Sequence, residues 1–361
     1  VLTACMLNKN TGLIKINRFS GTTYEEFMKS LEDLVENQGM QHLILDLRHN
    51  PGGYLEAATK ILDQLFTARK LLVYTEGRSY RRKEYNSTGK AMFQVNKVAV
   101  LIDESSASAS EIVAGAIQDN DRGLVIGRRS FGKGLVQEQY KLTDGSALRL
   151  TVARYFTPSG RYIQKPYDGS EGLYGDDLRK RYESGELYSR DSIYISDSTI
   201  YRTVNGRIVH GGGGIIPDIF IPLDTSRINA YFQSTNLLGR DYIYKFLDNK
   251  RAILVNQYPT FEDFEANYSI SDQFLDQLVS YAESKELKRD NDLLNKYAGD
   301  LKIEIKANLA DQLYGEVAYY KTLFSVDEMV QRAITEINRT GKGTQPSAMN
   351  EKKTSETQSN N

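Results

Sequence analysis

The chain has 361 residues, 40% of them hydrophobic, so it is long enough to form two or three domains with substantial cores. Its 46 basic and 47 acidic residues give a formal net charge of −1, which argues against nucleic acid or an anionic membrane surface as a partner. The single cysteine, Cys5, excludes an internal disulfide. No apolar run approaches the roughly 20 residues that span a bilayer, so no transmembrane segment is expected in this chain.

The first residues are too few to form a domain, and the first strand is predicted at residues 13–19. A helix should follow, because Thr22 and Thr23 each have a glutamate three residues later and so offer alternative capping boxes. Gly39 is a suitable end for this helix. Residues 43–47 then form a nearly continuous apolar run, the pattern of a strand in a sheet that is covered on both faces.

Residues 46–53 form a glycine-rich turn after this strand and lead into a helix predicted at about 54–66. A polar stretch at residues 75–96 is interpreted as a hairpin or a long loop, and residues 98–102 as a second buried strand. Strands that alternate with helices in this way predict an α/β layered core.

A run of small residues from Ser105 to Ser110 joins the strand at 98–102 to a helix through Ile112 and Ile117. A serine at such a turn can lie exposed above a sheet, beside helix N–H groups that lack intrahelical partners. Ser108 is therefore a candidate nucleophile. Ser108 and Glu111 also fit an S-x-x-E capping box, which only starts a helix, and this simpler explanation stays open.

A second unusual segment lies 25 residues further on, where Lys133 stands between two glycines in the run from Phe131 to Gln137. A short strand is predicted before it at residues 123–127, and a hairpin after it at 136–140 and 147–155. A surface loop would explain this lysine equally well.

The remainder of the chain divides by composition. Residues 167–210 suggest an irregular insert with one strand pair near Ile193–Val204, and residues 219–221 suggest a strand. From 225 to 340 the apolar residues recur with helical spacing, which predicts a helical C-terminal domain. Residues 341–361 are a polar tail for which disorder is expected.

Residues 43–53, 98–119 and 131–137 together closely resemble the C-terminal processing (tail-specific) peptidases, serine proteases with a Ser–Lys catalytic pair. Matched residue by residue, the resemblance makes Ser108 the nucleophile, Lys133 the general base and Gln137 the residue that orients the base. The run from Asp46 to Gly53 resembles the family's D-L-R-x-N-P-G-G element, and Gly211 to Asp218 its G-G-G-G-I-x-P-D element.

The resemblance implies an α/β, crotonase-like (ClpP/crotonase type) layered core with a helical C-terminal domain. The protease core would then occupy residues 1–224, followed by the helical domain at 225–340. In this family a PDZ-type peptide-binding module normally precedes the first strand, and it is missing here. Because the chain opens at Val1 without a methionine, we interpret it as a piece of a longer precursor whose export signal lies upstream.

Peptide cleavage by a Ser–Lys pair places requirements on the lysine and on the groups that stabilise the oxyanion. To act as a base near pH 7, Lys133 must lose a proton although the ordinary lysine pKa is about 10.4, a shift of roughly three units or about 4 kcal/mol. Apolar burial supplies shifts of that size. The oxyanion needs preorganised donors, and the candidates are the Ala109 N–H and an N–H of Gly52 or Gly53. A tight turn would need these glycines as well, so that reading stays open beside the oxyanion hole.

Three other interpretations remain. A Ser–His triad would use His49 or His210, since the chain has three histidines. A non-catalytic peptide- or ligand-binding protein on the same fold would use neither Ser108 nor Lys133 for turnover. An acyl-transfer or lyase enzyme of the crotonase type would need only the glycine amides.

The resemblance implies protein or peptide substrates with apolar C-terminal tails. It also implies the periplasm or cell envelope of a bacterium as the setting, and leaves a homo-oligomer open. No cofactor and no metal are expected, because no cluster of residues has metal-ligand spacing.

Overall fold

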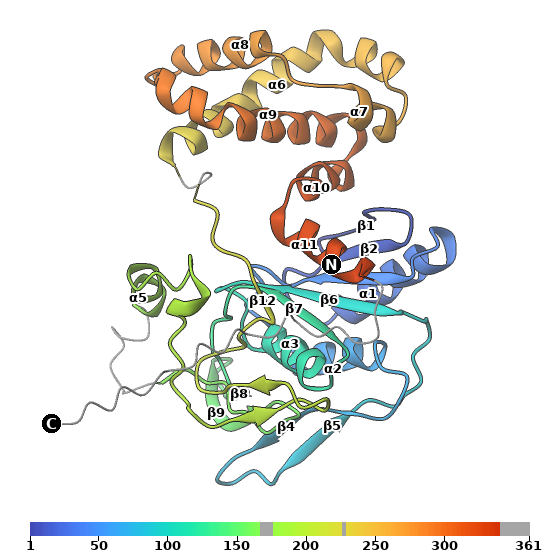
Figure 1. Cartoon of the computed structure of the whole chain (residues 1–361), viewed down its shortest axis with the longest axis vertical. Coiled ribbons are helices and arrows are strands. Elements are labelled where there is room, and N and C mark those ends of the chain that lie inside the picture. The colour runs from blue at the N-terminus through green and yellow to red at the C-terminus, as the bar shows by residue number, and fades with distance from the viewer. Residues whose placement is uncertain (167–175, 226–228, 340–361) are drawn as a thin grey trace, which may run out of the picture.

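The computed structural model describes residues 1–166, 176–225 and 229–339, and its centre is a six-stranded sheet with helices on both faces (Figure 1). Strand β1 is an antiparallel edge strand, and the other five strands run parallel. In spatial order the strands are β1 (Thr3–Met6), β2 (Thr11–Lys15), β3 (His42–Asp46), β6 (Lys97–Ile102), β7 (Gly123–Gly127) and β12 (Ile219–Phe220).

Both faces of this sheet are buried, as the continuous apolar run in β3 predicted. Leu43 and Leu45 point into a core shared with the first helices, whereas Ile44 points into a separate core on the opposite face. The helices of the first face are α1 (Thr23–Glu32), which continues as a π-helical turn at Asp33–Asn37, α2 (Leu55–Asp63) and α3 (Ala109–Asp119).

A second, four-stranded sheet has the order β5-β4-β9-β8 and lies below the first in Figure 1. Strands β4 (Leu71–Glu76) and β5 (Lys83–Asn86) form a hairpin, one of the two structures expected for this region. Strands β8 (Leu135–Lys141) and β9 (Ala147–Phe156) form the predicted hairpin. The α/β class expected from the sequence is confirmed.

The insert is more structured than its composition suggested. Its described part contains a helix, α5 (Asp177–Glu183), and a 3₁₀ turn at Arg190–Ser192. The strand pair expected near Ile193–Val204 is wrong in position, because β10 (Tyr201–Arg202) pairs with β11 (Ile208–Val209). The turn between them contains Gly206 with φ 86°, which fixes the hairpin several residues later than expected. Residues 167–175 lie outside the described residues.

The C-terminal region is helical, as expected. Four helices share a core of their own: α6 (Ala230–Gln257), α7 (Phe261–Asn267), α8 (Asp272–Glu283) and α9 (Asn291–Tyr314). Ser271 begins α8, with its side chain accepting a hydrogen bond from Phe274 N at 3.1 Å.

The last two helices pack on the second face of the central sheet, and the first of them also contributes Ala318 to the core of the bundle. Helix α10 (Glu316–Phe324) contacts β1, and α11 (Glu328–Asn338) packs across β3, β6 and β7 (Figure 1). The residues of α11 buried there are Met329, Val330, Ala333 and Ile337. The region predicted as a separate domain therefore also completes the core of the sheet. The boundary at residue 224 stays a prediction, and the tail at 341–361 lies outside the described residues.

The packing of α11 predicts a specific loss of stability. Ile337→Ala should lower the free energy of unfolding by about 2–5 kcal/mol, because Ile337 is buried against the central sheet. Ile253→Ala on an exposed position of α6 should change it by less than about 0.5 kcal/mol. Denaturant unfolding measures both variants, and equal small effects would show that α11 is not part of the core.

Candidate active site

Ser108 lies at the turn between β6 and α3 and has a φ of 56°, a left-handed conformation that non-glycine residues seldom adopt. Its neighbours Ser106 and Ser110 are fully buried, and their hydroxyls donate to Leu47 O at 2.8 Å and Asn50 O at 2.9 Å. Ser108 is only half-buried. Of these three serines, Ser108 is therefore the one that a substrate can reach.

The predicted helix cap at Ser108 also exists, and it does more than start a helix. Ser108 is the N-cap of α3, and the Glu111 carboxylate accepts from Ser108 N at 2.7 Å. The same carboxylate accepts from Lys133 N at 2.8 Å, Gly132 N at 2.7 Å and Ser130 Oγ at 2.6 Å. The serine turn and the lysine loop thus share one buried acceptor.

Two residues bridge the serine turn and the lysine loop from different sides. Burial raises the pKa of the Glu111 carboxyl, although its hydrogen bonds oppose that rise. The Tyr155 hydroxyl on β9 lies 3.2 Å from Ser108 O and also donates to Lys133 O. The sequence offered Glu111 only as part of a capping box, and no signal in it indicated Tyr155.

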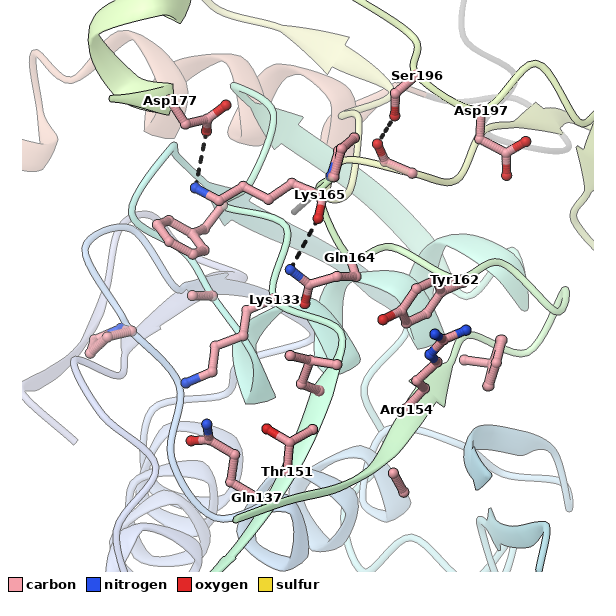
Figure 2. A pocket seen from close by; sticks show the side chains of 18 of the residues that line it. Lys133, Gln137, Thr151, Arg154, Tyr162, Gln164, Lys165, Asp177, Ser196 and Asp197 are labelled. Atoms are coloured by element: carbon pink, nitrogen blue, oxygen red, sulfur yellow. Dashed lines mark hydrogen bonds and ion pairs between the residues drawn. The ribbon is translucent and has the colours of Figure 1, made fainter. Parts of the chain in front are cut away.

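The side chains of Lys133 and Gln137 lie near each other. Figure 2 shows their polar ends turned toward each other on one side of a cleft. The β8–β9 register shifts between Val136 and Gln137, an irregularity that changes the direction of a side chain. Within the described residues, Lys133 Nζ has no ion-pair partner.

The glycine-rich turn lies directly against the serine turn. A Cβ added to Gly52 would be 2.8 Å from Ser108 Cβ and 2.9 Å from Ala109 N, so no other residue fits there. Gly52 is buried, has a φ of 96° and donates its N–H to Asn50 Oδ1 at 2.9 Å. Asn50 in turn donates to Ile16 O at 2.8 Å.

These contacts distinguish the candidate oxyanion donors. The Gly52 N–H is used within the turn, whereas Gly53 is exposed. In the part of the chain that the structure describes, neither Gly53 N nor Ala109 N donates a hydrogen bond to another residue. Of the three candidate donors, Ala109 N and Gly53 N are therefore the two without an acceptor among the described residues.

A cleft of about 1850 Å³ runs along the lysine loop and β9 (Figure 2). Its walls come from the glycine turn, the serine turn, the second sheet and the insert. The larger apolar side chains on these walls are Phe131, Leu135, Val152, Phe156, Tyr162 and Leu178. Among the described residues, no group of three His, Cys, Asp or Glu side chains could hold a metal ion.

The histidines do not form a triad with Ser108. His49 Nδ1 lies 3.0 Å from Asp103 Oδ2, and this hydrogen bond raises the pKa of His49. His210 lies beside Arg161, and burial lowers its pKa. No hydrogen bond joins any histidine to Ser108 in the described chain.

Ion pairs at the end of β3 hold the start of the glycine-rich turn. Arg48 Nη2 lies 2.7 Å from Asp46 Oδ2, and Lys15 Nζ lies 3.1 Å from the same oxygen. Burial disfavours the charged form of Asp46, but Arg48 and Lys15 outweigh this effect and hold the pKa of its carboxyl well below the usual range.

A half-buried serine at a strand-to-helix turn, close to a loop that carries a lysine, resembles the layout of a serine peptidase site. Residues 10–171 match the sequence model of peptidase family S41, so this segment carries the sequence pattern of that family. Residues 233–315 match a family of unknown function (DUF8443). Within the described residues, no helix is both long and apolar enough to cross a membrane.

Several known proteins are similar in sequence to parts of this chain. A carboxyl-terminal-processing protease of Picosynechococcus sp. is 41% identical over 157 residues, which cover 44% of this chain and 37% of that protein. Carboxy-terminal processing protease CtpB of Bacillus subtilis is 32% identical over 253 residues, which cover 69% of this chain and 51% of that protein. A solved structure of a photosystem II D1 C-terminal processing protease is 36% identical with a TM-score of 0.39. The match covers 43% of this chain and 39% of that one. The chain thus spans at most about half the length of these relatives.

The Glu111 carboxylate, which accepts hydrogen bonds from both the serine turn and the lysine loop, gives a testable prediction. Glu111→Gln should lower the free energy of unfolding by about 1–3 kcal/mol, because the amide group cannot accept all four buried hydrogen bonds. The exposed Glu25→Gln on α1 should change it little. Urea unfolding at pH 7 compares them, and equal stabilities would contradict the assigned contacts.

The lowered pKa of Asp46 predicts that the free energy of unfolding depends on pH. Because its pKa is lowered by folding, its stabilisation is present above the unfolded pKa of about 3.9 and is lost as the pH falls below it. Asp46→Asn should cost about 3–5 kcal/mol at pH 7, because Arg48 and Lys15 lose a buried partner. We expect the gap between the free energies of unfolding of the unaltered chain and Asp46→Asn to narrow below about pH 4. Unfolding experiments across acidic pH measure it. A gap that stays constant would be inconsistent with the ion pairs.

Proposed function

We propose that the chain is a serine endopeptidase that cuts proteins at or near their C-terminal tails. Ser108 is the nucleophile, Lys133 the general base and Gln137 the residue that orients the base. The observation that carries the proposal is that a strained, reachable Ser108 and Lys133 are held by the same buried Glu111 carboxylate.

The reaction follows from this arrangement. Lys133 Nζ takes the proton of Ser108 Oγ as that oxygen attacks the peptide carbonyl carbon. The developing oxyanion accepts hydrogen bonds from Ala109 N and Gly53 N. The Lys133 ammonium then gives its proton to the leaving amine, and an acyl-enzyme ester remains on Ser108. A water molecule, deprotonated by Lys133, hydrolyses that ester and restores the free serine.

Gln137 and Gly52 have supporting roles in this proposal. The Gln137 side-chain oxygen accepts from the Lys133 amine and directs its lone pair toward Ser108. The Gly52 N–H binds Asn50 and so fixes the turn that presents Gly53.

The proposed substrates are extended polypeptides with apolar tails. Apolar side chains on the cleft walls support this choice, because they remove apolar substrate surface from water. The family resemblance extends the proposal to an exported bacterial protein of the periplasm or cell envelope, and to a possible homo-oligomer. The relatives' names describe carboxyl-terminal processing, in keeping with cleavage near a tail.

The direct test uses an unfolded, apolar-tailed protein as substrate, with products read by mass spectrometry. Ser108→Ala and Lys133→Ala should each lower kcat by about 10³-fold or more, because each removes a group that takes part in the chemistry. Gln137→Ala should lower it by about 10²-fold through misorientation of the base.

Matched controls are Ser280→Ala on α8 and Lys141→Ala on β8, both exposed, which should keep full activity. Cleavage that survives in Ser108→Ala would refute the proposal. Binding without cleavage by the unaltered chain would favour a non-catalytic binding protein instead.

A further inference from the structure

An ion pair connects the glycine-rich turn to the last helix of the chain. Arg48 Nη1 lies 2.6 Å from Asp327 Oδ2, although the two residues are 279 positions apart. The rest of the Arg48 guanidinium is held by Asp46, with Nε and Nη2 donating at 2.9 Å and 2.7 Å. Only 13% of the Arg48 side chain is exposed, so this pair is shielded from solvent far more than an ordinary surface salt bridge.

The two oxygens of the Asp327 carboxylate have different partners. Oδ1 accepts from Val330 N at 3.0 Å and so caps the N-terminus of α11. Oδ2 holds Arg48. The helix cap and the link to the turn are therefore separate interactions, and a substitution can remove one while keeping the other.

The opposite end of α11 is also anchored, but away from the site. Lys97 Nζ donates to Ile337 O at 2.5 Å and to Arg339 O at 2.8 Å. Lys97 is the first residue of β6, at the other end of this strand from the serine turn. Helix α11 is thus held near the turn by Asp327 and at its other end by Lys97. Substitutions at these two residues can therefore test separately what α11 does for the turn and for the stability of the fold.

Arg48 is close in sequence to the groups that matter for catalysis. Its own N–H donates to Asp46 Oδ1 at 3.0 Å, and its carbonyl accepts from Lys15 Nζ at 3.3 Å. The turn continues through Asn50 to Gly52, whose added Cβ would lie 2.8 Å from Ser108 Cβ. Such a tight fit means that a small displacement of the turn moves the Gly53 N–H relative to the nucleophile.

We propose that Asp327 is a positioning residue of the catalytic centre. By holding Arg48 it fixes the turn that carries Gly53, so α11 contributes to stabilisation of the transition state as well as to the fold. This inference rests on the proposed peptidase function. Asp327 touches neither substrate nor Ser108 and acts only through Arg48.

The test is Asp327→Asn, because asparagine caps a helix as well as aspartate does but cannot form the ion pair. Its kcat should fall about 10-fold with KM changed less than about 2-fold, a smaller loss than removal of an oxyanion donor, because Asn50 and Asp103 still hold the turn. Asp327→Glu should recover most of the activity.

Two control variants separate positioning from stability. Asp290→Asn makes the same chemical change at the N-cap of α9, which has no link to the site. Lys97→Met releases the other end of α11. Both should keep kcat within about 2-fold of the unaltered chain, a difference of less than about 0.4 kcal/mol. Equal losses of kcat in Lys97→Met and Asp327→Asn would overturn the inference, because α11 would then act only through stability.

A second readout does not depend on activity. Amide hydrogen exchange of residues 47–54 should be faster in Asp327→Asn than in Asp290→Asn and Lys97→Met. Unchanged exchange in Asp327→Asn would overturn the inference even if the chain is a peptidase. If the unaltered chain cleaves nothing, the proposed function fails, while the exchange measurement still decides whether Asp327 fixes the turn.

Discussion

The buried carboxylate of Glu111 is the contact on which the site depends. It accepts four hydrogen bonds, one from the serine turn and three from the segment that leads into the lysine. A buried carboxylate is costly unless donors surround it, so the two segments must meet in one arrangement for the chain to fold. The hydrogen bonds that offset the cost of burying this charge therefore also fix the position of the Ser108 backbone relative to that of Lys133.

The layered fold supplies the framework for this relation. The strands of the central sheet end at one edge, where the turn after β3 and the turn after β6 lie side by side. Helix α3 begins at the second turn and presents the Ala109 N–H there. The second sheet adds the β8–β9 hairpin, which carries Gln137 and Tyr155. The insert then closes one wall of the cleft through α5.

Much of this architecture was predictable from local sequence, because it rests on short-range patterns. Continuous apolar runs indicated the buried strands, and glycine and serine runs indicated the turns between strand and helix. The motifs around Ser108, Lys133 and Gly52 identified the segments that meet at the site. Helical periodicity likewise identified the C-terminal region, but not the packing of α11 on the sheet.

What the sequence did not reveal depends on contacts between distant residues. Glu111 looked like a helix cap, because nothing local shows that its second oxygen faces a loop 20 residues away. The pair of Arg48 with Asp327 joins positions 279 residues apart, and either residue alone resembles an ordinary surface charge. The sequence also could not distinguish Gly52 from Gly53 as candidate donors, because only the structure shows that Gly52 N donates to Asn50.

If Ser108 is the nucleophile, it becomes acylated during turnover. The most direct measurement is rapid acid quenching of a reaction with an apolar peptide ester, followed by peptide mapping of the trapped adduct by mass spectrometry. The trapped acyl group should lie on Ser108 and on no other residue. Substrate turnover with no adduct at any time point, or with the adduct on another side chain, would contradict it.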